Sequence, residues 1–228
     1  ADTTSYRRLA SVLLKWMPGG SGGYDGTRVP GYALFLALTG TDQAAWLAQM
    51  GMGVVITLLL YTIGWKLSGK AWLGGVAALA HTLNIGQLFF ESNLLTETLA
   101  TFWIMLALAG LVWGADLARR SQHRLGLVLL AAGMGLAIAM AVLTRPLFVY
   151  LPFWLALCLA YTWQPQPVGE LVKTARWRGL WQALQNVLWP LAALTLAVAL
   201  PVLGWVRFIY QTYGFFSLTV MTGYHLVQ

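Results

Sequence analysis

Acidic side chains are scarce in this chain, which has only seven Asp and Glu residues among 228. Charged residues of both signs make up 9% of the sequence, hydrophobic residues make up 59%, and the mean hydropathy is +0.68. The single cysteine, Cys158, lies inside an apolar run, so an intrachain disulfide framework is excluded. No basic stripe alternates with aromatic residues, so the formal net charge of +7 does not indicate a nucleic-acid partner.

The apolar residues are grouped in blocks of helical length instead of alternating with polar residues. Such blocks are typical of an all-α integral membrane protein, because a helix needs roughly 20 apolar residues to cross the hydrocarbon core. We therefore expect a polytopic bundle of about six transmembrane helices, with spans over 44–65, 71–90, 95–114, 125–143, 147–163 and 187–206.

The short loops between these spans carry unequal numbers of positive charges. One side has Lys66, Lys70, Arg119, Arg120, Arg124, Lys173, Arg176 and Arg178. The other side, outside its long first loop, has Arg145 and Arg207. The positive-inside rule makes the first side cytoplasmic. Five of the seven carboxylates then face the extracytoplasmic side, namely Asp2, Asp25, Asp42, Glu91 and Glu97. Ionisable groups are costly in so apolar a chain, so this face is where chemistry is expected.

Residues 1–43 form the long first extracytoplasmic loop, which is predicted to hold interfacial helices. One apolar face of the segment after Asp2 is made by Tyr6, Leu9, Ala10, Leu13 and Met17. This pattern predicts a helix lying along the membrane surface. A second, short helix is expected over 32–38, with Pro30 preset for its start, and Asp42 is the expected N-cap of the first span.

Residues 44–206 are predicted to form the transmembrane bundle, and residues 207–228 to begin the next extracytoplasmic loop. Within the bundle, a cytoplasmic segment over 168–186 has tryptophan and leucine side chains on one helical face and basic or amide side chains on the other. This segment is predicted to be an amphipathic helix on the inner leaflet, where an anchoring role is expected.

Five short motifs occur in the order and membrane register of one enzyme superfamily. They are Asp-x-x-x-Tyr-x-x-Leu-Ala from Asp2, Arg-x-Pro-Gly-Tyr-x-Leu-Phe-Leu-Ala-Leu from Arg28, Leu-Leu-Thr-Glu-Thr over 94–98, Gly-Leu-Ala…Leu-Thr-Arg-Pro over 135–146 and Gly-Trp-Val-Arg…Tyr-Gly-Phe-Phe-Ser-Leu over 204–218. Together they resemble GT-C glycosyltransferases, in the branch related to protein O-mannosyltransferases and the aminoarabinose transferase of lipid A. Each motif alone is weak, and the specificity lies in their shared order along the whole chain.

Two departures accompany this resemblance. Members of the superfamily begin with a transmembrane helix before the aspartate and continue through further spans, whereas this chain starts at Ala1 and ends at Gln228. The chain is therefore expected to correspond to the N-terminal part of the membrane core. The Asp-Glu pair of some branches is Asp2-Thr3 here, which weakens the transfer of roles from those branches.

The resemblance implies an inverting transferase in a bacterial inner membrane, with its active site on the extracytoplasmic face. It would move a sugar from a polyprenyl-phosphate donor to an acceptor glycan, lipid or protein. Asp2 matches the catalytic aspartate, which takes the acceptor's proton, although an aspartate there could instead cap the following helix. Glu97 matches the second acidic position, or else complements its helix dipole. Glu91 is a weaker candidate.

Cations must stabilise the phosphate as it leaves. Arg28 matches the residue that contacts the carrier phosphate, with a snorkelling interfacial cation as the alternative. Tyr6, Arg145 and Arg207 are assigned to the same phosphate, and for Arg145 a structural ion pair is an equal alternative. His81 is expected to be a hydrogen-bonded residue of the bundle. No zinc spacing is present and no cofactor is predicted, while a divalent metal stays open because some relatives use one.

A second class of function is a non-catalytic membrane subunit that keeps a glycosyltransferase-like bundle and holds a lipid or a protein partner in a larger membrane complex. A transporter is a third option, but the spans show no internal repeat and no matching pair of Gly- or Pro-broken helices. The joint presence of Asp2, Arg28 and Glu97 favours the enzyme, because a scaffold needs no such outward pattern of charge.

Overall fold

The computed structural model describes residues 2–15, 24–120, 124–163 and 177–220, and within these the side chains at 2–4, 14–15, 87–88, 91–92 and 177–186 are left undescribed. The described residues are helical and contain no strand. The elements are α1 (Asp2–Lys15), α2 (Pro30–Thr39), α3 (Asp42–Ser68), α4 (Ala71–Thr82), α5 (Ile85–Ser92), α6 (Thr96–Arg120), α7 (Arg124–Thr144), the 3₁₀ helix η1 (Pro146–Tyr150), α8 (Leu151–Thr162) and α10 (Trp177–Tyr213).

Four of these helices are long and apolar enough to cross a membrane: Asp42–Ser68, Thr96–Arg120, Arg124–Thr144 and Val187–Tyr213. The class predicted from the apolar blocks, a helical membrane protein, is therefore confirmed. The number of six spans is not, because the other two blocks form shorter elements.

Local chemistry explains both shorter elements. The block over 71–90 breaks at Leu83 and Asn84 into α4 and α5, and Asn84 favours such a break because its amide competes for backbone hydrogen bonds. The block over 147–163 begins with η1, which starts at Pro146, and continues as α8, with a second proline in the first turn of α8. Proline is tolerated at the start of a helix but has no backbone N–H to donate. A new helix therefore begins at each of these prolines.

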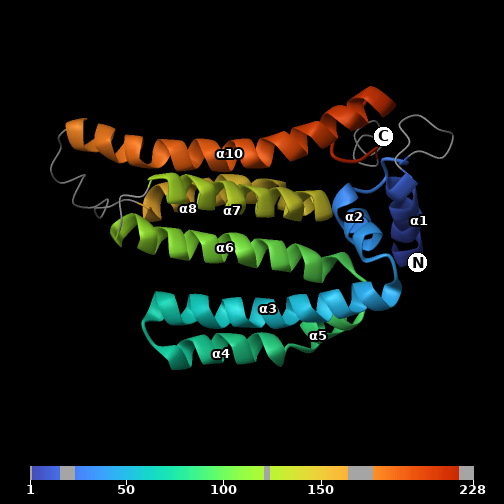
Figure 1. Ribbon diagram of the computed structural model, residues 1–228, viewed down its shortest axis with the longest axis horizontal. Helices are drawn as coiled ribbons and strands as arrows, with labels where there is room; N and C mark the ends of the chain where they lie inside the picture. Colours follow the sequence, from blue (N-terminus) through green and yellow to red (C-terminus); the bar gives the residue numbers. More distant parts are fainter. Residues whose placement is uncertain (1, 16–23, 121–123, 164–176, 221–228) are drawn as a thin grey trace.

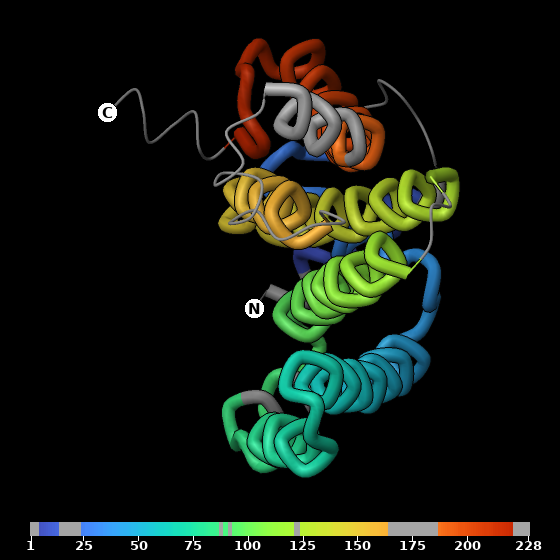
Figure 2. The backbone as a smooth tube through the Cα atoms, turned by 90° about the vertical axis from the view of Figure 1, so that its left-hand side faces the viewer, coloured from blue at the N-terminus to red at the C-terminus, as the bar shows by residue number. Residues whose placement is uncertain are grey.

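The long helices run alongside one another, and α1 and α2 lie at one end of the bundle, with α1 crossing that end (Figure 1). Seen end-on, the bundle stacks from α10 through α7 and α6 to α3, with α4 outermost (Figure 2). Helix α1 forms after Asp2, as the apolar pattern predicted, and its Leu9 is 3% exposed and packs in a cluster with Tyr32 and Leu36 of α2.

The larger apolar core lies between α6, α7, α8 and α10, around Ile138, Leu159 and Leu194. Small residues allow these helices to approach closely. A Cβ on Gly135 of α7 would meet the backbone carbonyl of Leu194 on α10. Close backbone approach at small residues is the usual packing device of helices in membranes, where lipid provides no hydrophobic drive between them.

Two details of the sequence prediction are wrong. Asp42 is not the N-cap of α3, because the helix is capped by Thr41, whose side chain accepts a hydrogen bond from Ala44 N at 3.1 Å. Asp42 lies in the first turn and forms an ion pair with Arg7 of α1 instead. The last span does not end at 206, since α10 continues to Tyr213.

The structure describes only parts of two other predicted regions, the amphipathic segment 168–186 and the loop 207–228. The amphipathic segment predicted over 168–186 lies outside the described residues up to 176, and residues 177–186 are the first part of α10 and continue directly into the span. In the predicted loop 207–228, helix α10 occupies the first residues, residues 214–220 follow it, and 221–228 lie outside the described chain.

Candidate functional site

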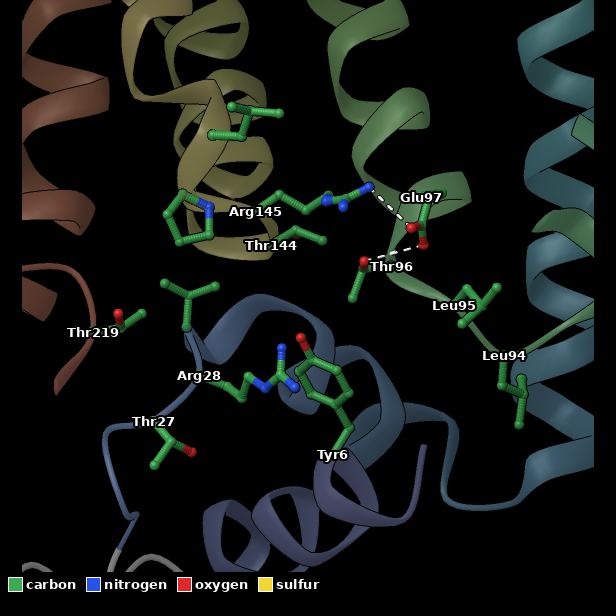
Figure 3. Close-up of a pocket in the computed structure, with 13 residues that line it drawn as sticks. Tyr6, Thr27, Arg28, Leu94, Leu95, Thr96, Glu97, Thr144, Arg145 and Thr219 are labelled. Carbon is green, nitrogen blue, oxygen red and sulfur yellow. Dashed lines mark hydrogen bonds and ion pairs between the residues drawn. The ribbon is translucent and has the colours of Figure 1, made fainter. Parts of the chain in front are cut away.

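A cavity of about 350 Å³ lies at the end of the bundle where α1 and α2 are found. Five parts of the chain line it: α1, the loop before α2, the start of α6, the α7–η1 turn and the segment after α10. Figure 3 shows Arg28 and Tyr6 on one side, with Arg145 and Glu97 on the other. Residues separated by more than 200 positions in the sequence thus share one small space.

Glu97 and Arg145 form an ion pair across the cavity wall. Arg145 Nη1 lies 3.0 Å from Glu97 Oε1, and Glu97 Oε2 accepts a hydrogen bond from Thr96 Oγ1 at 3.2 Å. Arg145 follows the last turn of α7 with an extended backbone, the conformation that a following Pro146 imposes. Its side chain therefore leaves the line of α7 and reaches the first turn of α6 (Figure 3). The ion-pair alternative for Arg145 is present in the structure.

Arg28 lies over the ring of Tyr6, with its guanidinium carbon 5.6 Å from the ring centre, which is a cation–π contact. Tyr6 is 7% exposed and its ring meets the ring of Tyr32 edge-on at 5.1 Å. Both Arg28 and Tyr6 line the cavity. The rings of Tyr6 and Tyr32 therefore support the Arg28 guanidinium on the side of the cavity opposite Glu97.

The loop that carries Arg28 is held at several points. Asp25 Oδ1 accepts hydrogen bonds from the backbone and hydroxyl of Thr27, at 3.0 and 2.7 Å. Gly26 has φ +67°, and a Cβ there would overlap Val220, whose backbone N–H donates to the carbonyl of Gly26 at 2.9 Å. This is a position that requires glycine, because both the conformation and the close approach exclude a side chain.

Tyr24, in the same loop, bonds both within the loop and to α10. Its hydroxyl donates to the carbonyl of Val29 at 3.2 Å, and its own carbonyl accepts from the hydroxyl of Tyr213. Burial, assisted by the nearby Asp25 carboxylate, raises the pKa of Tyr24, so its hydroxyl remains a neutral donor. The loop that carries Arg28 is thus held by a bond within itself and by a bond from α10.

Gln49 of α3 forms hydrogen bonds to chain segments on both sides of the cavity. It is fully buried, and its Nε2 donates to the carbonyls of Leu95 at 3.0 Å and Asn93 at 3.4 Å. Its Oε1 accepts from the hydroxyl of Tyr32 at 3.4 Å. One side chain therefore ties the loop that leads into Glu97 to the tyrosine that supports Tyr6.

Four of the residues selected from the sequence meet in this cavity: Tyr6, Arg28, Glu97 and Arg145. Arg207 does not line it, and lies exposed on α10. The two guanidinium groups and one carboxylate give the cavity a formal charge of +1. Such a site can hold a phosphate-like anion, with a carboxylate close by to accept a proton.

Three other candidates lie apart from this group or outside the description. Asp2 is the first residue of α1, four residues before Tyr6, and its side chain is outside the described part of the structure, as is that of Glu91 in α5. His81 Nδ1 is 3.2 Å from Thr57 Oγ1, in agreement with a hydrogen-bonded bundle residue. Among the described residues, no three or more His, Cys, Asp and Glu side chains are grouped to hold a metal ion.

Sequence reasoning missed Gln49 and Thr219. Gln49 carried a usable signal, because a lone amide inside an apolar span needs buried partners. Thr219, which is 8% exposed and lines the cavity, carried none, because it reaches the site through the return of the chain after α10.

No protein-family model, curated protein or solved structure matches this chain. The features of the chain that bear on its function are therefore its helical membrane fold and the charged cavity at one end of the bundle.

Proposed function

We propose that this chain is a membrane glycosyltransferase, or a membrane part of one, that transfers a sugar from a polyprenyl-phosphate donor to an acceptor. The observation that carries the proposal is the cavity in which Arg28, Arg145 and Glu97 meet. In the proposal the acceptor is a glycan, lipid or protein, and the protein resides in a bacterial inner membrane.

The charge distribution supports an extracytoplasmic site. Lys66, Arg119 and Arg124 lie at the inner ends of α3, α6 and α7, opposite the end that holds the cavity (Figure 1). By the positive-inside rule the cavity end is extracytoplasmic. This is the side on which lipid-linked sugars are consumed in the proposed reaction.

The proposed reaction is a single displacement with inversion at the anomeric carbon. The acceptor hydroxyl oxygen bonds to that carbon, the bond from the carbon to the phosphate oxygen breaks, and the electron pair remains on the phosphate. Arg28 and Arg145 stabilise the charge that develops there. Asp2 is proposed to take the acceptor's proton, with Glu97 as the second acidic group. A divalent metal would supply further phosphate stabilisation if the enzyme uses one.

The alternative proposal is a non-catalytic membrane subunit that keeps this bundle to hold a partner in a larger complex. One observation favours it: Glu97 is engaged by Arg145 at 3.0 Å, as expected of a pair that has a structural task. The two proposals differ on two points. One is whether a lipid phosphate binds in the cavity, and the other is whether a protein that no longer binds this phosphate loses sugar transfer.

The first experiment is extraction of the protein followed by mass spectrometry of the bound lipid. A co-purifying polyprenyl phosphate is the expected result, and Arg28→Ala should reduce its retention because phosphate is charged in ground and transition states alike. Arg8→Ala is the matched control, since Arg8 is exposed on α1 and does not line the cavity. Equal retention in both variants would contradict the assignment of Arg28.

The second experiment measures sugar transfer in the complete protein, with and without a metal chelator. Asp2→Asn keeps the size of the side chain, so it should bind donor normally while transfer falls at least ~100-fold, the low end of a general base's contribution. Near-normal transfer in a folded Asp2→Asn protein would refute the catalytic role of Asp2. Absence of both bound lipid and transfer in the complete protein would favour the subunit.

A further inference from the structure

A second cavity, of about 400 Å³, lies at the opposite end of the bundle between the inner ends of α3 and α6. The apolar part of its lining, termed the floor, is made by Ile63, Leu67, Leu108, Leu111 and Val112, of which Leu67 and Leu108 are exposed. Its rim is charged, and is made by Lys66, Asp116 and Arg119. This cavity shares no lining residue with the one proposed for sugar transfer, so it has no part in that reaction.

The cavity follows from how α3 and α6 pack. Toward the middle of the bundle the helices are in close apolar contact, with Ile56 and Ala109 buried together. Nearer the inner end, a Cβ on Gly114 of α6 would overlap the ring of Trp163, the residue that follows α8. At that end an ion pair joins α3 to α6, with Lys66 Nζ 2.8 Å from Asp116 Oδ2.

The rim carries positive charge in excess of the ion pair between Lys66 and Asp116. Asp116 is bonded to Lys66 on one oxygen and to Arg120 on the other, at 2.8 and 2.9 Å. Arg119, which is exposed, also lines the cavity, so the charged lining holds two cations, Lys66 and Arg119, and one carboxylate. Lys66 has three N–H donors and uses one on Asp116, so it retains donors for a further anion.

We propose that this cavity is a binding site for an anionic phospholipid of the inner leaflet. Its phosphate lies between Lys66 and Arg119, and one acyl chain occupies the apolar floor between α3 and α6. Basic pockets between transmembrane helices on the cytoplasmic side are suited to such head groups. A free phosphate would match the rim but leave the floor uncovered, and a zwitterionic lipid would cover the floor but gain less from the net positive rim.

The test uses the purified chain in bilayer discs that contain phosphatidylglycerol and phosphatidylcholine, with retained lipid counted by native mass spectrometry. Phosphatidylglycerol should be retained in preference. Arg119→Gln should reduce that preference about fivefold, the effect of about one Lys or Arg near a membrane surface. Arg124→Gln is the matched control, because Arg124 is exposed at the same end of the bundle and does not line the cavity.

A second variant separates the acyl-chain site from the charge. Leu108→Trp fills the floor of the cavity at a position that is 39% exposed, so it should fold and retain less phosphatidylglycerol with all cations intact. Equal loss in Arg119→Gln and Arg124→Gln would show diffuse surface attraction and overturn the proposal. So would equal retention of phosphatidylcholine, or displacement of the lipid by inorganic phosphate alone.

Discussion

Replacing Gln49 by leucine tests whether one buried amide holds the two sides of the candidate site together. Leucine has a similar volume and no polar atoms, so the substitution removes three hydrogen bonds without opening a large cavity. The bonds lost are those to the carbonyls of Leu95 and Asn93, at 3.0 and 3.4 Å, and from the hydroxyl of Tyr32, at 3.4 Å.

The magnitude follows from the geometry of these bonds. A protein hydrogen bond contributes about 1 kcal/mol, and one in a membrane protein about 0.6 kcal/mol. Two of the three are long, so their direct loss should cost about 1 kcal/mol in total. Tyr32 is 0% exposed, and its hydroxyl would lose the acceptor that Gln49 provides. Leaving a buried donor without a partner costs about 1–3 kcal/mol, which brings the expected loss to about 2–4 kcal/mol.

The assay is thermal unfolding in detergent, followed by tryptophan fluorescence. For a chain of this size, the expected loss lowers the Tm by roughly 4–16 °C. Hydrogen exchange at residues 93–97 should also become faster, because the loop loses its anchor. Gln43→Leu is the matched control, since Gln43 is exposed on the same helix. A Gln49→Leu protein with the Tm and loop exchange of the Gln43→Leu protein would refute the proposed link.

Three further substitutions test the packing of helices outside the cavity. Gly74→Val should destabilise the protein by about 1–3 kcal/mol, because a Cβ on Gly74 would overlap the backbone of Tyr61 on α3. Gly75→Val is its control, has open space around it and should change the Tm little; equal losses would contradict the close α3–α4 contact. Arg7→Gln should cost about 1 kcal/mol, because Arg7 bonds both Asp42 and backbone carbonyls of α2. Asp42→Asn should cost less than about 0.5 kcal/mol, because Asp42 is 68% exposed, and a larger loss than for Arg7→Gln in the same melting assay would argue against this order.

Local pattern was sufficient to predict the helical class and several element boundaries. Apolar blocks of helical length need no partner to be recognised, since crossing a membrane imposes both length and composition. Pro30 begins α2 as predicted, because proline has its preferred place at the first turn of a helix. The division of 71–90 was not predicted, since the effect of Asn84 on the backbone depends on its surroundings.

The candidate site shows the same division between local and long-range information. From the sequence we could predict a helical membrane protein, the end of the bundle where most carboxylates lie, and a shared site for Tyr6, Arg28, Glu97 and Arg145. The pairing of Arg145 with Glu97, the separate position of Arg207 and the place of Thr219 in the cavity became known only from the packing of the helices. The physical reason is that hydropathy and charge act locally along the chain. A hydrogen bond or ion pair between distant residues, in contrast, depends on the rotation and spacing of whole helices, which packing at small residues sets.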